Sequence, residues 1–114
     1  MIIIAFSDRT SKILPRILCH GMKHVAPIGV YQDKLIMYQF IKPGKINQIR
    51  LSMRDLQILQ RHGWRFIYLT GDLAYNFNNT NAKTCVQLSK HAIGIKNIYI
   101  QTPNSLYKYL LSDL

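Results

Sequence analysis

The stretch Thr84–Gly94 carries both a start signal and a stop signal for a helix. Thr84 is a good N-cap residue, and Gln87 three residues later completes a capping box. Gly94 supplies the left-handed position at which such a helix ends. These limits predict a short helix with Cys85 in its first turn.

The cysteine in that first turn has two interpretations. Cys85 shares one helix face with Leu88 and Ala92, so its sulfur points the same way as apolar side chains. Most buried cysteines of this kind are inert. However, the backbone N–H groups and the macrodipole at a helix N-terminus favour an anion, which lowers the pKa of a thiol and makes it nucleophilic. The helix taken alone favours the inert interpretation.

The size and composition of the chain predict one globular domain over residues 1–114. Of the 114 residues, 48% are hydrophobic, which is typical of an ordered protein with a core. The two cysteines are too few for a disulfide framework, and nothing has the spacing of a zinc site. The apolar start Met1–Phe6 is too short for a signal peptide, and no run approaches membrane-spanning length. We therefore expect a soluble protein with no signal peptide, no membrane span and no metal or other cofactor.

The charge of the chain favours anionic partners. Fifteen Lys and Arg residues face five Asp and no Glu, which gives a formal net charge of +10. Nucleic acid, acidic cell-wall polymers and a membrane surface are all candidates. The basic residues are dispersed, however, and Arg50, Arg54 and Arg61 form at best a modest patch on one helix flank. A basic nucleic-acid-binding module is therefore the second-ranked class of function.

Apolar runs and turn residues predict the remaining elements. Strands are expected at Ile2–Phe6, His24–Tyr31, Lys34–Ile41, Ile46–Leu51, Trp64–Thr70 and Asn97–Gln101. Besides Thr84–Gly94, helices are expected at Ser11–Cys19, from Ser52 to about His62, and from Thr102 to Leu110-Leu111. This order predicts an α+β fold, with a largely antiparallel sheet of about five strands and helices packed on it.

Turn residues refine this expectation at two places. Gln32 and Asp33 separate two strands and predict a hairpin. Pro27 and Gly29 predict that the first of these strands lies at a sheet edge or contains a bulge. The asparagine-rich segment Gly71–Ala82 is expected to be a loop.

The four histidines differ in what their positions suggest. His91 lies on a different face of its helix from the cysteine, His62 ends a helix, and His20 falls in a loop. His24 opens a strand, and a strand residue has the fixed direction that a general base needs. Taken alone, even this histidine is more typical of a structural residue than of a catalytic one.

The order of elements resembles the circularly permuted papain-like fold, the group that contains permuted NlpC-type peptidases and lecithin:retinol acyltransferase-like proteins. In that group the histidine precedes the cysteine in sequence. The similarity is greatest to small papain-like proteins encoded by bacteriophages. These carry Thr-Cys-Val-x-x-Val-Lys-x-x-Leu-Gly-Ile and end in Thr-Pro-x-x-Leu-Tyr-x-Tyr/Phe-Leu. The matching stretches are Thr84–Ile95 and Thr102–Leu110.

The resemblance implies that Cys85 is the nucleophile, that its backbone N–H is an oxyanion donor, and that His24 is the general base. It also implies a third polar group on the strand after the histidine, where Tyr38 and Gln39 are the candidates and point to opposite faces. We favour Gln39, because an amide oxygen can accept from the imidazole N–H. A neutral partner stabilises an imidazolium less than the acidic residue common in this family.

Three classes of function follow from the sequence. The first is a papain-like cysteine hydrolase, an amidase or peptidase whose substrate is a peptide or amide and whose candidate target is peptidoglycan. The second is a catalytically inactive papain-like fold that serves as a viral structural or interaction protein with virion assembly partners. The third is the nucleic-acid-binding module. The resemblance places the protein in the host cytoplasm or in the virion.

Overall fold

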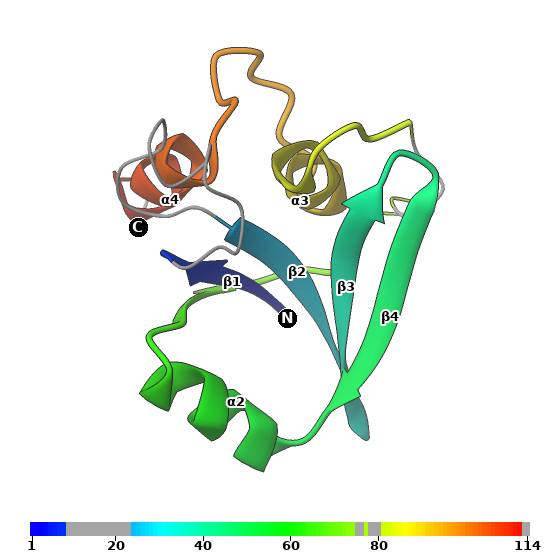
Figure 1. The fold of residues 1–114 in the computed structure, drawn as a ribbon, viewed down its shortest axis with the longest axis vertical. Helices are drawn as coiled ribbons and strands as arrows, with labels where there is room; N and C mark the ends of the chain where they lie inside the picture. Colours follow the sequence, from blue (N-terminus) through cyan, green and yellow to red (C-terminus); the bar gives the residue numbers. More distant parts are fainter. Residues whose placement is uncertain (9–23, 75–76, 78–80, 113–114) are drawn as a thin grey trace.

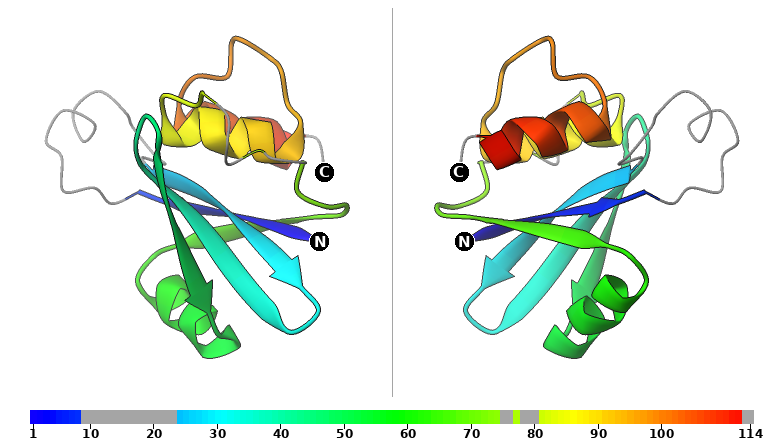
Figure 2. Two further views of the ribbon diagram at one scale, coloured as in Figure 1. Left: turned by 90° about the vertical axis from the view of Figure 1, so that its right-hand side faces the viewer. Right: turned by 90° about the vertical axis from the view of Figure 1, so that its left-hand side faces the viewer.

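Five strands form a single antiparallel sheet with the order β4-β3-β2-β1-β5. The computed structural model describes residues 1–8, 24–74, 77 and 81–112. The strands are β1 (Ile2–Ser7), β2 (His24–Tyr31), β3 (Lys34–Lys42), β4 (Lys45–Leu51) and β5 (Arg65–Leu69). The helix α2 (Met53–Arg61) covers one face, and α3 (Cys85–Ile93) and α4 (Pro103–Ser112) cover the other (Figures 1 and 2). The expected α+β class with a largely antiparallel sheet is confirmed.

Strand β1 is apolar from Ile2 to Phe6 because both of its faces are covered. Ile2, Ile4 and Phe6 belong to the cluster that includes residues of α3 and α4. Ile3 and Ala5 point the other way and belong to the cluster that includes Leu56 of α2. A strand between two helical layers has no solvent face, so its side chains do not alternate between apolar and polar.

Strand β2 is the central strand of the sheet, and its described ladders with β1 and β3 contain no bulge, so the expectation of an edge or bulged strand is wrong. It pairs with β1 from His24 to Gly29, and Pro27 lies opposite Ile4. Its pairing with β3 covers only Ile28–Tyr31. At Pro27 the strand is therefore paired on one side, and proline is tolerated because no second ladder needs its missing N–H. The predicted hairpin between β2 and β3 is confirmed.

The caps of α3 agree with the sequence signals except in one bond. The Thr84 side chain accepts from the Gln87 N–H at 3.1 Å, and Gly94 adopts a left-handed φ of 76°. The Gln87 side-chain oxygen accepts from the N–H of Lys83 at 2.8 Å, one residue before the N-cap. The capping box predicted at Thr84 is thus displaced by one residue, whereas Ser52 and Asp55 form a complete box on α2.

The segment 97–101 is not a strand, contrary to the expectation for Asn97–Gln101. The ammonium of Lys90 is buried under this segment and donates to the carbonyls of Asn97 at 2.5 Å and Ile100 at 3.0 Å. These carbonyls satisfy a buried cation instead of a neighbouring strand, and the segment forms a loop that projects beyond α3 and α4 (Figure 2). The predicted helix at Ser11–Cys19 and part of the predicted loop at Gly71–Ala82 lie outside the described residues.

Replacement of the buried lysine should destabilise the protein. In Lys90→Met, the buried carbonyl of Ile100 and the part-buried carbonyl of Asn97 lose the ammonium from which they accept, at a cost of about 2 kcal/mol. Chemical denaturation should show this loss in the free energy of unfolding. Lys108 is exposed on α4, so Lys108→Met should change the free energy by less than about 0.5 kcal/mol. Equal effects of the two substitutions would show that the carbonyl contacts do not stabilise the loop.

Candidate functional site

Cys85 is the first residue of α3 and is half-buried against the cluster between this helix and the sheet. The cap places it there, since the Thr84 side chain and carbonyl accept the N–H groups of Gln87 and Leu88. Leu88 and Ala92, which share its face, are fully buried and anchor the helix on the sheet. The helix start therefore has a fixed position, and the thiol lies within its field of N–H groups.

His24 is the first residue of β2, the strand on which α3 packs. The start of β2 and the start of α3 lie at the same end of the molecule in both views of Figure 2. The His24 ring makes a T-shaped contact with Trp64, with 5.8 Å between ring centroids and an interplanar angle of 88°. Residues far apart in the sequence are thus brought to one end of the sheet.

The two side chains nevertheless leave the backbone on different sides of the sheet. Val25 belongs to the cluster against which Cys85 packs, whereas Ala26 belongs to the cluster on the α2 side. His24 has the direction of Ala26, and its contact with Trp64 places its ring on that side. Strand alternation thus directs the His24 and Cys85 side chains towards opposite sides of the sheet at one end of β2.

Gln39 lies on the same side of the sheet as His24. It is half-buried, and with Trp64 it lines a largely apolar cavity of about 310 Å³ between α2 and strands β3 and β4. Trp64 therefore contacts the histidine and borders the same cavity as the glutamine. Tyr38 points to the opposite face, where its ring packs on Phe77 with centroids 4.8 Å apart. This is the arrangement that strand alternation predicts for the two candidates.

The structure describes two further histidines. His62 is the C-cap residue of α2, and His91 is exposed in the last turn of α3. His20 and Cys19 fall outside the described residues. Trp64 was not a predicted site residue. Nothing in its local sequence marks it, because its proximity to His24 arises from the pairing of β1 with both β2 and β5.

Neither a metal site nor a spanning helix is found in the described part of the chain. No group of three His, Cys, Asp or Glu side chains there is placed to hold a metal ion. Among the same residues, no helix has the length and apolar character needed to cross a membrane.

Comparisons with protein-family models, with curated proteins and with solved structures give no match.

The buried tyrosine should be identifiable by its titration. Burial and the 2.8 Å hydrogen bond with the Tyr31 hydroxyl raise the pKa of Tyr38 to about 12, compared with 10.0 for an ordinary tyrosine. Because the neutral form is favoured in the folded state, the free energy of unfolding should fall as the pH rises from 10 towards 12. Ultraviolet absorbance should show one late-titrating phenol that disappears in Tyr38→Phe. A late phenol that persists in this variant would contradict the assignment.

Proposed function

We propose that this chain is a cysteine hydrolase that cleaves an amide or peptide bond, with Cys85 as nucleophile, His24 as general base and Gln39 as the residue that orients the imidazole. The observation that carries the proposal is the position of Cys85. It is the first residue of a capped helix that packs on the strand beginning with His24. The resemblance of Thr84–Ile95 to phage papain-like proteins supports the same assignment.

The chemistry needs a thiolate and an imidazolium that stabilise each other. The thiolate attacks the carbonyl carbon, and the resulting oxyanion accepts from the Cys85 backbone N–H. As the C–N bond breaks, the imidazolium gives its proton to the leaving amine and a thioester remains. Water, deprotonated by the neutral imidazole, then attacks the thioester and releases the acid and the thiol.

Two features of the described chain fit this scheme. The N-terminus of α3 favours the thiolate, because its N–H groups and the helix dipole interact with an anion. The Gln39 amide lies on the same side of the sheet as His24, and an amide oxygen can accept from an imidazole N–H. Peptides linked to acidic cell-wall polymers are a suitable substrate class for a protein of net charge +10.

The contact between His24 and Trp64 favours a second candidate. With its ring held on the α2 side, the imidazole is on the other side of the sheet from the thiol. A chain fixed in this state would be a catalytically inactive papain-like fold, used as a structural or interaction protein. The reactivity of the cysteine separates the two candidates.

Alkylation should report whether the thiol is activated. If Cys85 pairs with His24, iodoacetamide should label it with an inflection at least about one pH unit below the ordinary thiol value of about 8.5. The inflection should move back towards the ordinary value in His24→Ala. Peptide mass spectrometry of the labelled protein distinguishes Cys85 from Cys19, and Cys19→Ser is the matched control, in which the low inflection should remain.

An inflection of Cys85 near the ordinary value, unchanged by His24→Ala, would contradict the hydrolase and leave the inactive fold. A low inflection that survives His24→Ala would show that the helix start activates the thiol without this histidine. That result would remove His24 from the site.

The role of Gln39 should appear as a smaller effect on the same profile. Gln39→Ala should lower the alkylation rate at pH 6 less than His24→Ala does, because orientation is lost while the base remains. In Gln39→Glu the carboxylate should favour the imidazolium and move the inflection to lower pH. Gln48 on β4 is exposed, and Gln48→Ala is the control that should leave the profile unchanged. Identical profiles for Gln39→Ala and the wild type would exclude Gln39 from the site.

A further inference from the structure

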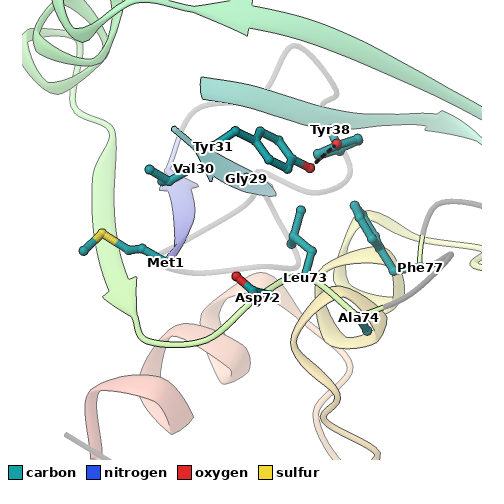
Figure 3. Close-up of a pocket in the computed structure, with 9 residues that line it drawn as sticks. All are labelled: Met1, Gly29, Val30, Tyr31, Tyr38, Asp72, Leu73, Ala74 and Phe77. Carbon is teal, nitrogen blue, oxygen red and sulfur yellow. Dashed lines mark hydrogen bonds between the residues drawn. The ribbon is translucent and has the colours of Figure 1, made fainter. Parts of the chain in front are cut away.

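A second cavity lies at the opposite end of β2 from His24, on the face of the sheet that carries α3. It has a volume of about 290 Å³ and lies between the end of the β2–β3 hairpin and the segment that follows β5 (Figure 3). Nothing in the proposed hydrolase uses it, because Cys85 and His24 lie at the other end of α3 and of β2. Its size suits a small organic ligand.

Three aromatic rings form much of its wall. Tyr38 and Phe77 are buried and pack edge to face, and the half-exposed Tyr31 ring lies near them at the rim. The hydroxyls of Tyr31 and Tyr38 are joined by the 2.8 Å hydrogen bond drawn in Figure 3. Burial and this bond favour the neutral form of the Tyr38 phenol, so its ring contributes a π face and no negative charge.

Because Gly29 has no side chain, the Tyr31 ring can lie against the backbone at the wall of the cavity. A Cβ at Gly29 would lie 2.8 Å from a methyl of Leu73 and 2.9 Å from the Tyr31 ring and hydroxyl. Any side chain at this position would therefore displace the tyrosine or the leucine from the cavity wall.

The one carboxylate among the described lining residues is that of Asp72. Asp72 is exposed at the rim, across the cavity from the hairpin (Figure 3). A cation seated between it and the rings would gain both a Coulombic and a cation–π contribution. The Tyr31 ring already makes one cation–π contact, because the ammonium of Lys34 lies 5.9 Å from the ring centroid.

We propose that this cavity binds a small organic cation, an alkylammonium group held between the aromatic rings of Tyr31, Tyr38 and Phe77 and the carboxylate of Asp72. The aromatic walls exclude water from one side of the cation, and the carboxylate balances its charge at the rim. The Asp72 carboxylate attracts a cation and disfavours an anion.

The test uses choline and its neutral isostere 3,3-dimethyl-1-butanol as probes. Binding of each probe is monitored through the NMR chemical shifts of the Gly29 and Ala74 amides. Choline should saturate both shifts, and the neutral isostere should bind at least about fivefold more weakly, as expected when a cation–π contact of roughly 1 kcal/mol is lost. Asp72→Asn should weaken choline binding by a similar factor, whereas Asp33→Asn in the hairpin turn should not. Lys34→Met should leave choline binding equal or tighter, because a competing charge is removed.

A matched pair of substitutions tests the rings themselves. Tyr31→Phe keeps the π face and should bind choline within about twofold of the wild type, whereas Tyr31→Leu should lose at least about fivefold. Equal binding of choline and its neutral isostere, an unaltered affinity in Asp72→Asn, or no shift at 100 mM choline would each overturn the proposal. Cys85→Ala should bind choline normally, so this result is separate from the outcome for the hydrolase.

Discussion

The burial of β1 and β2 on both faces is the constraint on which the rest of the structure depends. Ile4, Ala5, Ala26 and Ile28 are completely buried, because α2 packs below these strands and α3 and α4 pack above them. A central strand that is apolar on both sides cannot lie at a surface without a large hydrophobic penalty. Because both faces of these strands are apolar, each face is covered by a layer of helix. The packing of these layers fixes where the N-terminus of each helix lies relative to the sheet.

The packing of α3 on the sheet determines the positions of Cys85 and His24 in the candidate site. It fixes the start of α3 over β2, which gives Cys85 a defined place at a helix N-terminus. The same alternation along β2 directs the His24 ring towards Trp64 and α2. The two residues of the proposed catalytic pair are therefore directed from the backbone towards opposite sides of the sheet. Gln39 lies on the same side of the sheet as His24.

Local signals in the sequence predict the helices and strands well. Contacts between residues far apart in the sequence are harder to predict. The caps at Ser52 and Thr84 and the hairpin turn at Gln32 act through neighbouring backbone groups, so the sequence contains all the information they need.

The central position of β2 was not predicted, because it depends on where the β3 ladder stops relative to Pro27. The loop at 97–101 was also missed, because apolar residues there resemble a strand until Lys90 is known to lie beneath them. For the site, alternation predicts opposite faces for Tyr38 and Gln39, but the contact of His24 with Trp64 depends on the pairing of three strands.

Titration of the His24 ring gives a direct test of the proposed thiolate–imidazolium pair of Cys85 and His24. In an NMR titration of the His24 imidazole C–H shift, the midpoint should be at least about one pH unit higher in the wild type than in Cys85→Ala, because a neighbouring thiolate favours the imidazolium. The same midpoint in the two proteins would contradict the pair, whatever the reactivity of the cysteine.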